Sequence, residues 1–128
     1  MDALQTYLDT VRTTPFQWGE HDCAMFVAKA VDAMRGTRWA NRVRGLGCRS
    51  ARDYRAMLRD GATMPALTVA ELGEPVNEEI ERGDVLLLRN HGRQLLAIAA
   101  PPVALAVSTA DGVTALPLTD VLATWRIR

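Results

Sequence analysis

Cys23 is the residue of this sequence whose chemistry is easiest to define. It follows Asp22 and precedes residues 24–34, in which apolar side chains recur at helical spacing. Asp22 is a favourable N-cap residue, so a helix should begin at Cys23 and end near Gly36. A thiol at a helix N-terminus lies near the positive end of the helix dipole, which favours the thiolate. Cys23 is therefore a candidate nucleophile; the alternative is a small, buried apolar residue.

A cysteine nucleophile needs a base that removes its proton and later protonates the leaving amine. The sequence offers two histidines, His21 and His91. His91 lies in an Asn90-His91-Gly92 turn that we expect between two strands. It is a candidate base, and the alternative is an exposed turn residue without a catalytic role. His21 precedes Cys23 by two residues, and a hydrogen-bonding loop residue is its alternative role.

Trp18 and Asp22 are candidate substrate-binding residues because they lie on the same loop as Cys23. Each also has a structural interpretation, since large aromatics beside a helix start pack into cores and Asp is a common N-cap. Asp84, which follows Gly83, is expected to fix the turn into the first strand.

The sequence predicts neither a metal site nor a cofactor. Its cysteines and histidines are Cys23, Cys48, His21 and His91, and they lack the paired spacing of a zinc site. No phosphate-binding loop or dinucleotide fingerprint is present. We expect both cysteines to be free thiols because the protein is made in the cytoplasm, which is a reducing environment. The alternative is a disulfide bond between them.

Hydrophobic periodicity predicts helices followed by an antiparallel sheet, an α+β fold in one domain over residues 1–128. The expected helices cover residues 2–12, 23–35, the segment from Ser50 to Gly61, and part of 64–74, with a loop holding one helical turn at 36–49. The expected strands lie at 85–88, 95–99, 103–107 and 113–116. A closing helix over 118–125, capped by Thr119, completes the prediction, with a final extended piece at 125–127.

Composition excludes several classes of protein. The 128 residues have zero net charge and 48% hydrophobic residues, typical of one globular domain and without an electrostatic reason to bind nucleic acid. The start lacks the basic and apolar regions of a secretory signal. The longest apolar stretch is interrupted by Pro101 and Pro102, so we expect no membrane span.

Arginine supplies fourteen of the fifteen basic residues, Lys29 being the exception. Several arginines cluster between Arg35 and Arg59, where acidic residues are few. One interpretation is a solvated surface or a coding bias toward arginine. The other is a binding surface for phosphate or for the carboxylates of a partner.

The motifs described above resemble those of the NlpC-type branch of papain-like cysteine peptidases. In that family a Trp-Gly and an Asp-Cys pair lead into the central helix, and a Gly-Asp pair opens the sheet. The matching pairs here are Trp18-Gly19, Asp22-Cys23 and Gly83-Asp84. A set of small phage and prophage proteins with Phe-x-Trp-Gly-x-x-Asp-Cys near the start is more similar still. Those proteins tend to end in a Trp-Arg-Ile-like sequence, as residues 125–127 do.

The resemblance implies a papain-like fold with Cys23 at the nucleophile position. It also implies a catalytic histidine at the start of the second strand, where this sequence has Gln94 or Leu95. His91 would reach Cys23 only through a different strand register. The resemblance therefore predicts a degenerate site in which the distance from the Cys23 sulfur to a histidine is too long for catalysis.

Genes of the similar phage proteins tend to lie among those for tail tips. The implied function is a structural component of a phage tail tip, located in the virion and bound to other tail-tip or hub proteins. The alternative is an active cysteine endopeptidase or amidase that cleaves peptidoglycan peptides during phage entry, with Cys23 as nucleophile. A third hypothesis is a host protein that binds a small ligand in the groove of the former active site.

Overall fold

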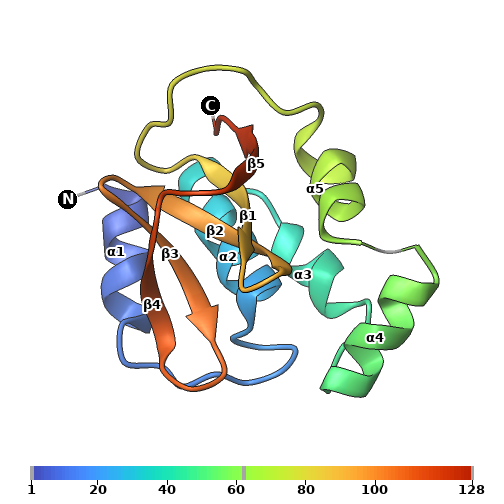
Figure 1. The fold of residues 1–128 in the computed structure, drawn as a ribbon. Coiled ribbons are helices and arrows are strands. Elements are labelled where there is room, and N and C mark those ends of the chain that lie inside the picture. Colours follow the sequence, from blue (N-terminus) through green and yellow to red (C-terminus); the bar gives the residue numbers. More distant parts are fainter. Residues whose placement is uncertain (1, 62, 128) are drawn as a thin grey trace.

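Helices occupy the first part of the chain and strands the second (Figure 1). The computed structural model describes residues 2–61 and 63–127, so residues 1, 62 and 128 of the predicted domain lie outside the described part. The helices are α1 (Ala3–Val11), α2 (Cys23–Arg35), α3 (Trp39–Arg44), α4 (Ala51–Arg59) and α5 (Met64–Leu72). The strands are β1 (Val85–Asn90), β2 (Arg93–Ala100), β3 (Val103–Ser108), β4 (Gly112–Pro117) and β5 (Val121–Trp125). The predicted α+β class is confirmed.

The strands form one antiparallel sheet in the order β4-β3-β2-β1-β5. The first four are joined by tight turns, and His91 and Gly92 make the β1–β2 turn with φ angles of 50° and 76°. Positive φ at both central residues is what a two-residue hairpin of this twist requires. β4 and β5 lie at opposite edges, so the chain between them crosses the sheet (Figure 1).

α2 is the helix against which the other elements pack. It contacts α1, α3, β2 and β3, and Phe26, Val27 and Ala30 on its buried face have no exposed surface. Gly36 ends it with a φ of 70°, a left-handed conformation that glycine adopts without steric cost. The predicted start at Cys23 and end near Gly36 are confirmed.

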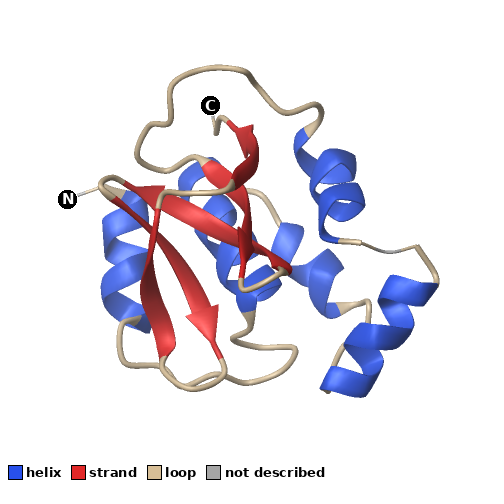
Figure 2. Ribbon diagram, viewed as in Figure 1, coloured by secondary structure: helices blue, strands red, loops and turns tan. Residues whose placement is uncertain are grey.

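The two faces of the sheet bury different cores because strand side chains alternate. Leu87, Leu96 and Ile98 face α2 and belong to the main core. On the opposite face, small residues such as Ala97 and Ala99 form a second core. Figure 2 shows α1 and α2 on one side of the sheet. The second core is closed by apolar residues that flank it in sequence: Ile80, Leu95, Leu116, Leu118 and Val121.

The predicted closing helix over residues 118–125 is wrong. Residues 121–125 form strand β5, which pairs with β1 and accepts a hydrogen bond from Val76 N to Thr124 O at 2.7 Å. The open edge of β1 offers a row of backbone N–H and C=O groups that β5 can pair with. A short helix here would form hydrogen bonds only within itself and would leave that edge unpaired. The pairing shifts between Leu87 and Leu88, which leaves Leu122 with 41% exposure. The predicted extended end is thus correct only for Trp125.

The loop predicted at residues 36–49 contains α3, which is capped from outside. Its own N-cap, Arg38, makes no side-chain capping bond. Instead the carboxylate of Asp32, on α2, accepts hydrogen bonds from the backbone N–H groups of Trp39 and Ala40 at 2.8 and 2.9 Å. A carboxylate at a helix N-terminus satisfies amides that have no partner in the helix. This contact therefore fixes the direction in which the chain leaves α2.

Asp84 fixes the entry into β1, as predicted. It is 1% exposed and accepts hydrogen bonds from Glu81 N at 2.8 Å and from Arg126 Nε at 2.8 Å. Arg126 also donates to the carbonyl of Glu79 and pairs with Glu78. The contact joins the end of the chain to the start of the sheet.

Asp84→Asn tests this connection. The substitution keeps the side-chain size but removes the charge that faces Arg126, whose side chain is 12% exposed. We expect the free energy of unfolding to fall by about 2–4 kcal/mol, since a nearly buried cation loses its main partner. Urea denaturation measures it. Glu81→Gln is the control, because that carboxylate is 67% exposed and should contribute less than about 1 kcal/mol. Equal stability of both variants would contradict the role given to Asp84.

Candidate functional site

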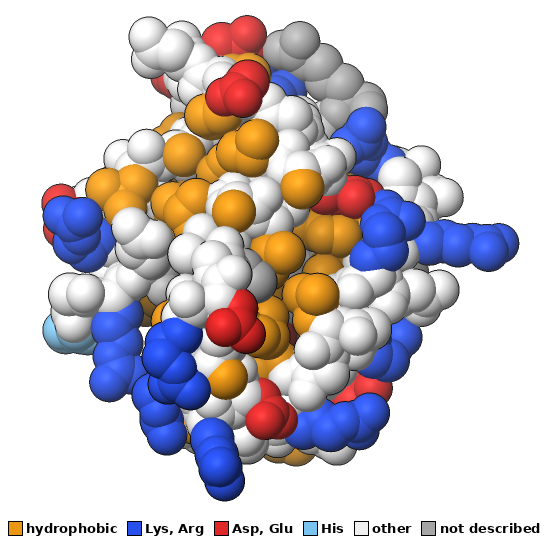
Figure 3. Space-filling model, turned by 90° about the vertical axis from the view of Figure 1, so that its right-hand side faces the viewer, with side chains coloured by type: hydrophobic (Ala, Val, Ile, Leu, Met, Phe, Trp, Pro, Cys, Tyr) orange, Lys and Arg blue, Asp and Glu red, His pale blue; other side chains and the backbone are white. Residues whose placement is uncertain are grey.

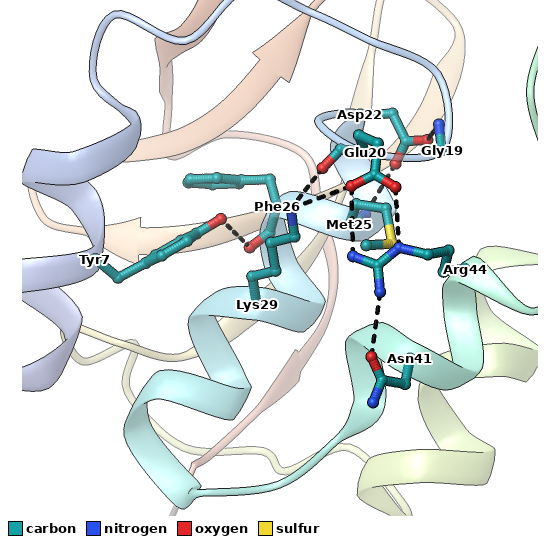
Figure 4. Close-up of polar contacts among 9 residues, drawn as sticks. All are labelled: Tyr7, Gly19, Glu20, Asp22, Met25, Phe26, Lys29, Asn41 and Arg44. Atoms are coloured by element: carbon teal, nitrogen blue, oxygen red, sulfur yellow. Dashed lines mark hydrogen bonds and ion pairs between the residues drawn. The ribbon is translucent and has the colours of Figure 1, made fainter.

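One carboxylate shapes the loop that leads into α2. Oδ1 of Asp22 accepts a hydrogen bond from Met25 N at 2.9 Å, and Oδ2 accepts one from Gly19 N at 2.8 Å (Figure 4). The first bond caps the helix and the second closes the turn before it. Asp22 is 7% exposed. Both of its oxygens are thus engaged by the backbone, which matches the structural interpretation of this residue.

The glycine of the Trp-Gly pair is required by close packing. Gly19 has a φ of 81°, and a Cβ atom there would lie 2.8 Å from the carbonyl oxygen of Cys48. A side chain would therefore push the two segments apart. Gly19 brings Cys48, which precedes α4, next to the loop that holds Asp22.

Charged side chains fix the outer side of the loop. Glu20 accepts hydrogen bonds from Arg44 Nε at 3.0 Å and, through its backbone carbonyl, from Lys29 Nζ at 2.8 Å (Figure 4). Arg44 also donates to Asn41 in α3. These exposed contacts tie the loop to α2 and α3, so the start of α2 is held from both sides.

Cys23 lines a cleft between the start of α2, strand β2 and helices α4 and α5. Its cavity volume is about 190 Å³, and most of its lining is apolar. Figure 3 shows apolar side chains exposed across one face of the molecule, with Lys and Arg side chains around them. The lining includes aromatic residues, three methionines and both cysteines: Phe16, Trp18, Tyr54, Met25, Met57, Met64, Cys23 and Cys48, with Leu46, Leu67, Arg93 and Gln94 among the others.

The environment of the Cys23 thiol opposes ionisation. Burial raises its pKa to about 11; the backbone N–H of Leu96 lowers it by less, and the charge of Asp22 raises it further. The backbone N–H groups of Cys23 and Ala24 at the helix start also lower the pKa, so the expected effect of the helix N-terminus is present but smaller than that of burial. The capping carboxylate places a negative charge beside the sulfur, and the apolar cleft removes water from it. Burial of the sulfur is the largest of these effects.

His21 lies under the loop. It is 3% exposed, its ring packs edge-on against Phe26 at a centroid distance of 6.2 Å, and neither ring nitrogen has a hydrogen-bond partner among the described residues. Burial lowers its pKa, and the charge of Lys29 lowers it further. The expected hydrogen-bonding role is wrong, and His21 makes no hydrogen bond to Cys23.

His91 is exposed in the β1–β2 turn. It is absent from the lining of the cleft, as is His21. On β2, Gln94 lies on the same face as Leu96 and Ile98, which point toward α2, and Gln94 lines the cleft. Of the residues predicted to take the position of the family's histidine, Gln94 is the one on the face of the sheet toward α2.

Trp18, a predicted substrate-binding residue, packs against other aromatic residues that line the cleft. Its ring packs edge-on against Phe16 at 5.0 Å and lies 6.0 Å from the ring of Tyr54 in α4. These aromatic contacts connect α4 to the loop before α2. The ring of Trp18 therefore forms part of the cleft wall.

Cys23 and Cys48 are free thiols in the structure, although both line the cleft. Among residues 2–61 and 63–127, no group of three Cys, His, Asp or Glu side chains is arranged to hold a metal ion. Within the same residues, no helix has the length and apolar character needed to cross a membrane.

Sequence reasoning missed the far wall of the cleft. The sequence predicts the helix that carries Tyr54 and Met57, but it does not indicate that these side chains line a cavity together with Cys23. Arg93 was likewise not connected with the site, and Cys48 was connected with Cys23 only through the alternative of a bridge between them. The sequence of α4 is strongly amphipathic, which is the feature that could have indicated an apolar surface here. In the structure none of its residues is buried.

The family model described as "Domain of unknown function (DUF6950)" matches residues 1–127. The chain belongs to the DUF6950 family. No curated protein matches its sequence. The DUF6950 match therefore includes every described helix and strand, from α1 to β5.

The thiol of this DUF6950 protein should react slowly. Raising the pKa of Cys23 from 9.0 to about 11 leaves about a hundredfold less thiolate at neutral pH. In a Cys48→Ser variant, iodoacetamide should alkylate Cys23 about a hundredfold more slowly than an ordinary thiol, with a rate that keeps rising up to about pH 11. Mass spectrometry follows the reaction. The same variant unfolded in urea is the control and should react at the ordinary rate. Rapid alkylation below neutral pH would contradict the prediction.

His21 should make stability depend on pH. Its folded pKa lies below 6.5, so its contribution to stability is complete above 6.5 and is lost as the pH falls through 6.5 toward the folded value. We expect the urea midpoint to decrease between about pH 7 and about pH 5. His21→Phe, which keeps a ring against Phe26, should remove this part of the decrease. His91→Gln is the matched control and should retain the decrease of the urea midpoint. Loss of the decrease in this variant would show that His91, and not His21, causes it.

Proposed function

We propose that this protein is a structural component of a phage tail tip whose papain-like, NlpC-type domain is catalytically degenerate. The observation that carries the proposal is the surroundings of Cys23. Its thiol has a raised pKa of about 11, and neither His21 nor His91 is among the residues that line its cleft. A thiol in this state has no group that removes its proton or protonates a leaving amine.

The other polar groups of the cleft do not replace the missing base. Both oxygens of Asp22 accept backbone hydrogen bonds. Burial raises the pKa of Tyr54, so its hydroxyl stays protonated at neutral pH. Arg93 is a cation, and Gln94 has no basic nitrogen.

Two features support the papain-like part of the proposal. A cysteine begins the central helix and faces an antiparallel sheet, and Asp84 of the Gly-Asp pair fixes the entry into that sheet. The tail-tip part rests on the similarity of the motif ending in Asp22-Cys23, and of residues 125–127, to those of small phage proteins. On this proposal the protein is located in the virion, and its partners are other tail-tip or hub proteins.

Turnover of purified peptidoglycan tests the loss of activity. Wild type and Cys23→Ala should release soluble fragments at the same background rate, because the thiol takes no part. In the phage that encodes the chain, Cys23→Ala should assemble tails at the wild-type yield, and the chain should be found in purified particles. Hydrolysis that Cys23→Ala abolishes would instead establish the alternative, a cysteine endopeptidase or amidase.

Gln94→His provides a positive control for the geometry. An imidazole on the cleft-facing side of β2 should stabilise the thiolate, so alkylation of Cys23 at neutral pH should become faster than in wild type. Thr10→His, at an exposed position of α1, should leave the rate unchanged. An unchanged rate in Gln94→His would mean that the lack of a histidine is not what keeps the thiol inert.

A further inference from the structure

We propose that the Cys23 cleft binds an amphipathic segment of another protein, with apolar side chains in the cleft and carboxylates against the arginines around it. This inference rests on the proposed function, because a site that retains no chemistry is free to act as a docking surface. It also assigns a role to the arginine cluster, which the proposed function does not use.

Large apolar side chains are exposed to solvent at the cleft and on α4, which forms one of its walls. Leu46, which lines it, is 42% exposed, and Leu58 on α4 is 38% exposed. They are two of the three large hydrophobic side chains with such exposure among the described residues, the third being Leu122 on β5. Contiguous exposed apolar surface rimmed by polar residues is typical of interaction sites.

The stretch of chain that contributes Leu46, Tyr54 and Met57 to the cleft is strongly positive. Residues 35–59 contain eight arginines and a single acid, Asp53. Arg42 and Arg44 are paired with Glu71 and Glu20. The remaining arginines of this stretch form no ion pair within residues 2–61 and 63–127: Arg35, Arg38, Arg49, Arg52, Arg55 and Arg59.

The arginines and the apolar surface lie together on α4. Arg55, Leu58 and Arg59 follow i, i+3, i+4 spacing and therefore share one face of the helix. Arg93 adds a further cation from β2, on the other wall of the cleft. Apolar surface with cations on both sides is complementary to apolar side chains flanked by carboxylates, which selects an acidic amphipathic segment.

Most of the acidic residues in the most acidic stretch of a second copy of this chain, residues 71–84, are already paired within that copy. Glu71 contacts Arg42, and Asp84 contacts Arg126. Ile80, an apolar residue of that stretch, packs into the second core. We therefore assign the cleft to a different protein.

Selection from a library of random peptides tests the proposal without a known partner. Peptides retained by the immobilised wild-type protein should be enriched both in Asp and Glu and in large apolar residues. No enrichment, or enrichment of basic or purely polar peptides, would overturn the proposal. A concentration-dependent increase in the mass of the protein alone, lost in Leu46→Ser, would also overturn it by assigning the cleft to a second copy.

The affinity of one enriched peptide, measured by isothermal titration calorimetry, then locates the site. Arg55→Glu should weaken binding at least about fivefold, and salt raised from about 0.05 M to about 0.5 M should weaken wild-type binding. Arg12→Glu, which reverses an exposed arginine after α1, should leave the affinity unchanged. Equal effects of the two charge reversals would show that only net charge matters and would overturn the proposal.

Leu46→Ser and Leu122→Ser form the second matched pair, because the two leucines have nearly equal exposure. Leu46→Ser should weaken peptide binding and Leu122→Ser should not; thermal melts confirm that both variants are folded. Peptidoglycan hydrolysis is measured separately. Absence of acidic peptide binding with no hydrolysis would remove only this inference, whereas hydrolysis dependent on Cys23 would remove the proposed function.

Discussion

The carboxylate of Asp22 is the interaction on which the candidate site depends. Its two oxygens cap α2 and close the turn at Gly19, so one buried side chain sets both where the helix begins and how the preceding loop approaches it. Gly19 in turn allows the carbonyl of Cys48 to pack against the loop. The start of α2, the loop and the segment before α4 are consequently positioned together.

The same carboxylate adds to the effect of burial, which is the largest influence on the pKa of the Cys23 thiol. A helix N-terminus favours an anion because its first amides lack partners within the helix and its dipole is positive there. Here Asp22 takes that place, and the apolar wall of the cleft withholds the water that would otherwise solvate a thiolate. Two effects of burial and charge therefore exceed the favourable effect of the helix. Position at a helix start is therefore not sufficient to lower the pKa of a thiol.

The fold separates a well-packed part from an open one. α1, α2 and the sheet bury two cores, one on each face of the sheet. α4, by contrast, has no buried residue and joins the loop before α2 through Trp18 and Tyr54. The cleft lies between these parts, so its apolar lining is held in place on one wall by the core and on the other by a surface helix.

The sequence by itself determined the local structure. The bounds of α2 follow from Asp22 and Gly36, and the β1–β2 turn follows from His91 and Gly92, because capping and turn conformations depend on neighbouring residues. The α+β order and the role of Asp84 were predictable for the same reason.

The tertiary structure alone decided what meets across the chain. Residues 121–125 are predicted as part of a closing helix, yet they form β5 because β1, distant in sequence, offers an unpaired edge. The burial of His21, the presence of Gln94 rather than a histidine in the cleft, and the meeting of Cys23 with α4 likewise depend on contacts between remote segments. No local pattern encodes such contacts, since each depends on which surfaces are left uncovered when the rest of the chain has packed.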